Sequence, residues 1–114
     1  MNEATRKAQL VKQIKATFPG FVVFRHEDSF TAGIPDISVS NRDVLKTVWL
    51  EVKYGNEPLT ALQEQTLRKL NGFVVRYPRG EGPTLVHSGR NLNLVEAAGA
   101  GHFPVLKILK ERLL

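Results

Sequence analysis

The sequence predicts an α/β fold of the α+β type, in which helices pack on one mixed β-sheet. The hydrophobic period changes several times between two and 3.6 residues, the periods of strands and helices. The order of these segments is helix, three strands, helix and two strands, with helical additions after Ser88. The length of 114 residues and the hydrophobic share of 42% suit a single domain over 1–114, with a core at about 3–87 and a helical extension at about 88–114.

The first half of the chain is expected to form one helix and three strands. A helix runs from about Glu3 to Phe18, where apolar residues recur at helical spacing, and Pro19-Gly20 ends it. β-Forming residues predict strands at Gly20 to Arg25 and at Ile34 to Ser40, separated by a loop. The turn Asn41-Arg42-Asp43 leads into VLKTVWLEVK, the longest β-like run, so the second and third strands are expected to form a hairpin.

The second half begins with a helix from Pro58 to Leu70, where the period returns to 3.6 and Gly72 lies just past the end. Gly72 to Tyr77 and Thr84 to His87 are expected to be short strands joined across the turn-rich PRGEGP. A closing helix from about Phe103 to Leu113 has a wide apolar face. Docking of this helix onto its own sheet is the first expectation, and a dimer contact is the alternative.

Composition excludes several classes of site. The chain has no cysteine, which excludes disulfides, thiolate zinc sites and cysteine nucleophiles. It has no stretch typical of a signal peptide or a membrane span, so we expect a cytoplasmic protein with no membrane partner. The formal net charge is +5, and residues 65 to 114 carry eight basic and three acidic side chains, whereas the preceding residues are balanced. A basic surface of this kind favours a polyanionic partner such as nucleic acid.

Three ionisable side chains lie in segments otherwise built for burial: Asp36 in GIPDISV, and Glu51 with Lys53 in VWLEVK. Because side chains alternate along a strand, Glu51 and Lys53 share a face, and the hairpin can bring Asp36 to Glu51. Two carboxylates about 4 Å apart repel by roughly 4 kcal/mol at an effective dielectric of about 20, so the pair needs a cation. Carboxylate oxygens suit Mg²⁺ or Mn²⁺, and a lysine beside the metal suits phosphodiester hydrolysis. Taken alone, E-x-K more commonly marks a surface ion pair.

The pattern Gly33-Ile34-Pro35-Asp36, followed after fourteen residues by Glu51-Val52-Lys53, resembles the PD-(D/E)xK nuclease superfamily. The G-x-P-D form, the E-V-K strand and Gln63 on the next helix more narrowly resemble the VRR-NUC family, virus-type replication-repair nucleases related to Holliday junction resolvases. The resemblance covers roughly residues 3 to 77 and implies a restriction-endonuclease-like αβββαβ core.

This resemblance also implies an activity and a setting. The family consists of Mg²⁺- or Mn²⁺-dependent endodeoxyribonucleases that hydrolyse phosphodiester bonds, so we expect a structure-specific enzyme acting on branched DNA such as a Holliday junction. A homodimer is implied, and no organic cofactor. A viral or prophage origin, with the bacterial host cytoplasm as the location, is implied by the family alone. The competing functions are a nuclease without junction specificity and a non-catalytic nucleic-acid-binding module on the same fold.

Residue roles carry over from the family by position. Asp36 and Glu51 match its metal-binding carboxylates, Lys53 matches its catalytic lysine, and the backbone carbonyl of Val52 matches a further metal ligand. Together these residues would hold the metal and position or activate the attacking water.

Two further site residues have equally good structural explanations. Gln63 matches a glutamine that the family places near the active site, but Thr60 and Gln63 also fit the T-x-x-Q capping box of a helix. Glu3 is the candidate for the first-helix glutamate that joins the metal site in the family, but an acid in the first turn also stabilises a helix.

Several polar residues are candidate DNA contacts. Arg25 and Ser29 lie at and beside the loop before the GIPD segment, and Arg68, Lys69 and Arg76 follow the expected catalytic strand. As phosphate contacts they would give affinity that is independent of sequence and falls with salt. Each of them is explained equally well or better as an ordinary solvated side chain.

Overall fold

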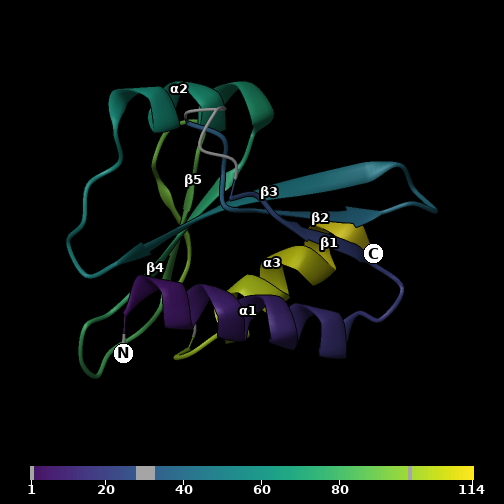
Figure 1. The fold of residues 1–114 in the computed structure, drawn as a ribbon, viewed down its shortest axis with the longest axis horizontal. Helices are drawn as coiled ribbons and strands as arrows, with labels where there is room; N and C mark the ends of the chain where they lie inside the picture. Colours follow the sequence, from purple (N-terminus) through teal and green to yellow (C-terminus); the bar gives the residue numbers. More distant parts are fainter. Residues whose placement is uncertain (1, 28–32, 98) are drawn as a thin grey trace.

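The computed structural model describes residues 2–27, 33–97 and 99–114. In chain order, the elements over these residues are α1 (Glu3–Thr17), β1 (Val22–Arg25), β2 (Ile37–Asn41), β3 (Lys46–Tyr54), α2 (Ala61–Leu70), β4 (Phe73–Tyr77), β5 (Leu85–Ser88), β6 (Leu94–Glu96) and α3 (Phe103–Leu113). The strands form one sheet in the order β1-β2-β3-β4-β5-β6 (Figure 1). Neighbouring strands are antiparallel except β3 and β4, which run parallel and are joined through α2. The expected mixed sheet is confirmed.

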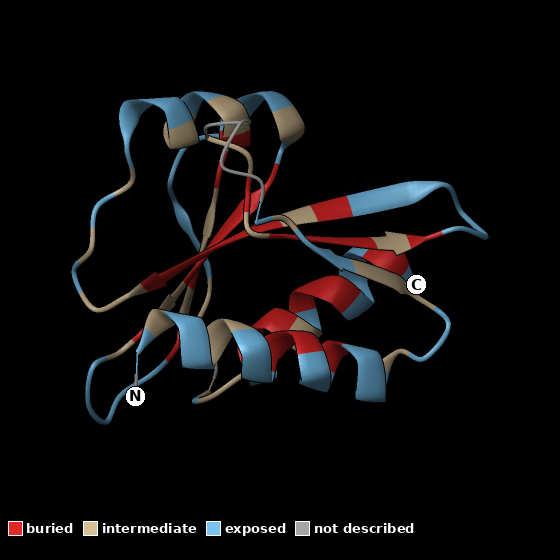
Figure 2. Ribbon diagram, in the orientation of Figure 1, coloured by how far each residue is buried: buried red, intermediate tan, exposed pale blue. Residues whose placement is uncertain are grey.

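The helices divide the sheet into a core face and a site face. Helices α1 and α3 lie on one side of the sheet, and α2 lies on the other (Figure 1). The alternation expected along β3 is present: Val48, Leu50 and Val52 belong to the core that α1 and α3 cover. Figure 2 places most of the buried residues in this layer. Glu51 and Lys53 therefore point to the opposite face, called here the site face, which also carries α2.

Helix α3 docks onto the sheet of its own chain, as first expected. Val105, Ile108, Leu109 and Leu113 are buried and belong to the same core as the apolar residues of β2 and β3. Asn41, at the end of β2, fixes the end of the helix, because its side-chain Nδ2 donates to the Leu113 carbonyl at 2.6 Å.

Within the described ranges, no helix combines the length and apolar character that crossing a membrane requires.

Strand β2 begins at Ile37, three residues later than the expected start at Ile34. Pro35 has no N–H to donate to a ladder. In addition, Oδ2 of Asp36 accepts the Val52 amide at 2.8 Å. Because Ile37 pairs with Leu50, a longer β2 would bring Pro35 opposite Val52. The Val52 N–H would then donate to a backbone carbonyl of β2 and not to the Asp36 side chain. Asp36 therefore lies at the point where β2 and β3 separate.

The remaining differences are at element ends. β3 begins at Lys46, because Val44 and Leu45 belong to the turn and Leu45 has a φ of 54°. Helix α2 begins at Ala61, three residues later than Pro58, because Thr60 is its N-cap. After Ser88, where helical additions were expected, the short strand β6 pairs with β5 before α3 begins.

Gly33, the first residue of the G-I-P-D segment, has a φ of +82°, which disfavours any residue with a Cβ. A Cβ built there would lie 2.6 Å from Cγ of Leu62 on α2. We expect Gly33→Ala to lower the free energy of unfolding by about 1–3 kcal/mol, measured by urea denaturation. Gly20→Ala is the matched control, since nothing lies within 4 Å of its Cβ position. Equal unfolding midpoints for the two variants would contradict this prediction.

Candidate active site

The candidate site is formed by three parts of the chain: the residue before β2, the second half of β3 and the first turn of α2. Asp36 is held in place by two contacts. Its Oδ2 accepts the Val52 amide at 2.8 Å, and its Oδ1 forms an ion pair with Nζ of Lys7, on α1, at 2.9 Å. The carboxylate is thus fixed in orientation at the edge of the gap between β2 and β3.

Glu51 is a buried carboxyl group with only 3% of its surface exposed. Burial raises its pKa to about 8, and the nearby negative charge of Asp36 adds to the rise. The positive charges of Lys53 and Lys7 lower the pKa but do not cancel the other effects. Asp36 and Glu51 are therefore close enough for their charges to interact, as expected, and burial disfavours the ionised form of Glu51 even with two lysines nearby.

The ammonium of Lys53 lies within ion-pair distance of two carboxylates. Its Nζ lies 4.0 Å from Oε2 of Glu51 and 3.6 Å from Oε1 of Glu57, and its side chain is only 8% exposed. Register places Arg76 directly opposite Lys53 on the neighbouring strand β4. Arg76 also fixes the segment after β3, since its guanidinium donates to the carbonyls of Gly55 at 2.8 Å and Glu57 at 2.6 Å.

Gln63 makes the contacts of the capping box and also reaches the carboxyl of Glu51. The side-chain Oε1 of Gln63 accepts a hydrogen bond from the backbone N–H of Thr60 at 3.0 Å. The backbone N–H of Gln63 donates to Oγ1 of Thr60 at 3.1 Å, which completes the capping box. Its Nε2 reaches Oε2 of Glu51 at 3.4 Å. The cap of α2 therefore orients the side-chain amide toward the buried carboxyl.

Glu3 lies in the first turn of α1, where Asn2 caps the helix by accepting the Thr5 amide at 2.9 Å. Its carboxyl shares a hydrogen bond with that of Glu57. Burial and this contact raise the pKa of Glu3 to about 7, and the same hydrogen bond lowers the pKa of Glu57. Glu3 is close enough to Asp36 for their charges to interact, but its hydrogen-bond partner is Glu57.

Lys7 and Glu57 are two parts of this cluster that the sequence analysis missed. A spacing of four residues from Lys53 to Glu57 was the available signal for Glu57. Lys7 follows Glu3 by one helical turn, so it shares the face of α1 that points to the site. Its contact with Asp36 spans 29 positions of sequence and has no local signature.

The candidate DNA contacts are scattered. Register places Arg25 in the row of Ile37 and Leu50, which faces the core side, and its guanidinium pairs with Glu27 at 2.8 Å. Arg68 and Lys69 are exposed in the last turn of α2, where cations also favour the helix dipole. Ser29 lies outside the described residues. Of these residues, Arg76 is the one that the structure brings next to Lys53.

The residues of the site fit a divalent cation. Two neighbouring carboxyl groups, one of them buried, supply hard oxygen donors. The N–H and C=O of a strand residue point to the same side, so the Val52 carbonyl faces the gap into which its amide binds Asp36. Over residues 2–27, 33–97 and 99–114, no group of three or more His, Asp or Glu side chains forms a metal-binding set. A metal here would thus depend on Asp36, Glu51 and the Val52 carbonyl, with water and substrate oxygens completing the set.

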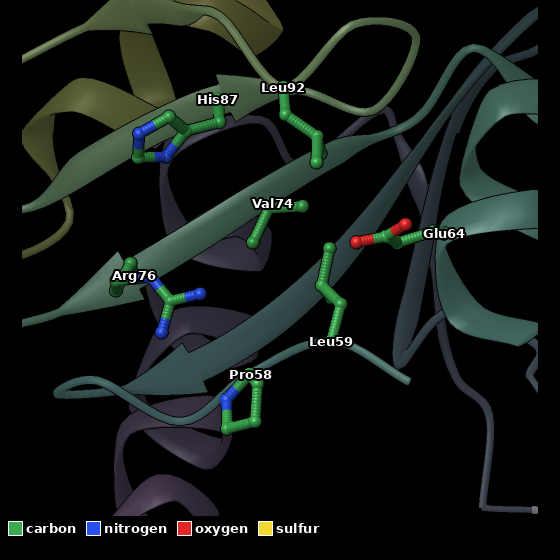
Figure 3. A pocket seen from close by; sticks show the side chains of 7 residues that line it. All are labelled: Pro58, Leu59, Glu64, Val74, Arg76, His87 and Leu92. Atoms are coloured by element: carbon green, nitrogen blue, oxygen red, sulfur yellow. The ribbon is translucent and has the colours of Figure 1, made fainter. Parts of the chain in front are cut away.

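An open pocket of about 340 Å³ lies beside these carboxylates on the site face. Its lining comes from the segment before α2, from α2 itself, from β4 and β5 and from the turn after β5: Pro58, Leu59, Glu64, Val74, Arg76, His87 and Leu92. Figure 3 shows the side chains of Leu59 and Val74 directed toward the space between them. The pocket includes neither Asp36 nor Glu51, so it extends the accessible surface next to the site.

Comparison of the sequence with protein-family profiles and with curated proteins finds no match. Among solved structures, the fold is similar to that of Hjc, a Holliday junction resolvase from the archaeal hyperthermophile Archaeoglobus fulgidus. The TM-score is 0.53 at 13% sequence identity, and the alignment covers 89% of this chain and 98% of that chain. The chain therefore has a mixed α+β fold of the restriction-endonuclease-like type, matching that of the archaeal resolvase.

Proposed function

We propose that this protein is a metal-dependent DNA endonuclease that hydrolyses phosphodiester bonds. The observation that carries the proposal is the partly buried Asp36 and the buried Glu51 beside the ammonium of Lys53, at the point where β2 and β3 separate. Removing two carboxylates and an ammonium from water costs free energy, and the two carboxylates also repel each other. Clusters of this kind are typical of functional sites. The fold similarity to a Holliday junction resolvase supports the same conclusion.

Each side chain has a defined part in this proposal. Asp36, Glu51 and the Val52 carbonyl would hold Mg²⁺ or Mn²⁺, which supplies charge neutralisation and Lewis-acid activation of the phosphate. Lys53 orients the attacking water and balances the negative charge that develops on the phosphate oxygens. Gln63 fixes the carboxyl of Glu51 through its hydrogen bond. Glu57 helps to position the Lys53 ammonium through the ion pair between them.

The proposed substrate is branched DNA, and the proposed family is VRR-NUC. The G-x-P-D and E-V-K motifs, with Gln63 on the following helix, support this narrower assignment. The site lies on a partly open sheet face, which suits a bulky substrate that approaches from outside. A homodimer would present two such sites and could cut two strands of one junction.

The test is cleavage of labelled four-way, flap, single-stranded and linear duplex DNA with Mg²⁺, Mn²⁺ or EDTA. We expect metal-dependent cutting with preference for the four-way junction. Equal cutting of all four substrates would contradict the proposed junction specificity but not the nuclease activity. Absence of cutting on every substrate would overturn the nuclease proposal and favour a non-catalytic DNA-binding module.

Lys53→Met should lower the cleavage rate by about 10²-fold or more, because it removes a charge that stabilises the transition state while keeping the alkyl stem. Lys46→Met is the matched control, since Lys46 is an exposed lysine at the other end of the same strand. Thermal unfolding of both variants verifies that the fold is intact. An unchanged rate in Lys53→Met would contradict the role given to this residue.

A further inference from the structure

Three rings form an aromatic cluster on the site face: Phe24, His26 and Trp49. The ring centroids of His26 and Trp49 lie 5.1 Å apart, and those of Phe24 and His26 lie 6.5 Å apart. Register places Phe24, Ser38 and Trp49 in one row across β1, β2 and β3. Because side chains alternate along a strand, Trp49 and Glu51 are neighbours on the same face of β3. The cluster therefore continues the candidate active site along the strand.

The cluster is not part of the hydrophobic core. Phe24 is 59% exposed, and His26 and Trp49 are both partly exposed. The neighbouring Val23, which points to the other face, packs against the core. His26 is held in place, since its Nε2 lies 2.8 Å from Oγ of Ser38 in a hydrogen bond. The result is a preformed aromatic surface that remains accessible from solvent, beside two carboxylates and a lysine.

We propose that this aromatic cluster stacks on unstacked or unpaired nucleobases of the DNA strand whose phosphate lies at Asp36 and Glu51, an inference that rests on the proposed nuclease function. Strand residues two apart are separated by about 7 Å, so a base on Trp49 and a phosphate at Glu51 can belong to one short stretch of DNA. Stacking on aromatic rings is tolerant of base sequence, because every base has a π-face.

The geometry also selects the kind of DNA. In a duplex, each base already stacks on its neighbours and offers no free face to a protein ring. Bases whose stacking is interrupted at a branch point, and unpaired bases at a flap or a strand end, do offer one. The cluster thus favours DNA with unstacked or unpaired nucleotides next to the cleaved bond over continuous duplex.

Trp49 is the only tryptophan in the chain, so its fluorescence reports on the cluster directly. The experiment titrates the protein, with Ca²⁺ in place of Mg²⁺, with a short oligothymidylate and with an abasic oligomer of equal length. Both oligomers carry the same phosphates, but only one carries bases. We expect oligothymidylate to quench the fluorescence and the abasic oligomer to bind more weakly without quenching.

Phe24→Ala should weaken binding of oligothymidylate by about tenfold and leave binding of the abasic oligomer unchanged. Phe103→Ala is the matched control, because Phe103 is 58% exposed on α3, in the layer on the other side of the sheet. It should bind like the unmodified protein.

Equal quenching by both oligomers, or unchanged oligothymidylate affinity in Phe24→Ala, would overturn the stacking proposal. A fluorescence change that depends on protein concentration and not on DNA would also overturn it, in favour of a second copy of the chain on this surface. These readouts need no cleavage. Failure of the nuclease proposal, seen as absence of cutting in Mg²⁺, is therefore distinguishable from failure of the stacking proposal.

Discussion

Asp36→Asn is expected to lower the cleavage rate by at least about 10³-fold while leaving most of the fold and the DNA affinity intact. The variant removes one of two carboxylates proposed to hold the metal. A metal ion supplies several kcal/mol of transition-state stabilisation. Each 1.36 kcal/mol corresponds to a factor of ten in rate. The Asn amide oxygen can still accept the Val52 amide that Asp36 binds at 2.8 Å, so the end of β2 keeps its anchor.

The matched control for this variant is Asp43→Asn, which makes the same change of charge in the exposed turn between β2 and β3. It should cut at the unmodified rate. Junction affinity measured with Ca²⁺ in place of Mg²⁺ separates loss of chemistry from loss of binding. If Asp36→Asn unfolds at a much lower temperature and binds no DNA, then Asp36 has a structural role and the metal assignment is wrong.

The local parts of this site could be predicted from the sequence. Alternation along VWLEVK was enough to place Glu51 and Lys53 on one face, because a strand has a fixed period of two. The turn after Asn41 was enough to predict the hairpin that brings Asp36 to Glu51. The capping box at Thr60 was readable from its spacing, although the simultaneous contact from Gln63 to Glu51 was not.

The parts that could not be predicted depend on contacts distant in sequence. The sequence pattern continued the strand through Asp36, but the tertiary bond to the Val52 amide replaces the ladder there. The contact of Lys7 with this carboxylate requires the packing of α1 against the sheet, which no local pattern encodes. Strand β6 has only three residues, and its position is set by pairing with β5. Tertiary context decided each of these features.

The metal-free protein should become less stable as the pH rises from about 4.5 to about 8. The pKa of Glu51 is near 4.5 in the unfolded chain and is raised to about 8 in the folded protein by burial and by Asp36. Over this window the folded state binds more protons than the unfolded state, so its stability falls with increasing pH. The contribution is fully present below pH 4.5 and is lost above pH 8. Urea denaturation in EDTA should show a loss of more than about 1.4 kcal/mol, the value of one pKa unit.

Glu51→Gln removes the titrating group and retains its size, so the pH dependence of its stability should be flatter than that of the unmodified protein. A smaller slope should remain up to about pH 7, because the raised pKa of Glu3 acts with the same sign. Addition of Mg²⁺ should stabilise the unmodified protein more at pH 8 than at pH 5, since the cation favours the ionised carboxyl and competes with its proton. Glu51→Gln should lose most of this Mg²⁺ effect. Parallel pH profiles for the two proteins, with equal responses to Mg²⁺, would mean that Glu51 is neither the carboxyl group with the raised pKa nor a metal ligand.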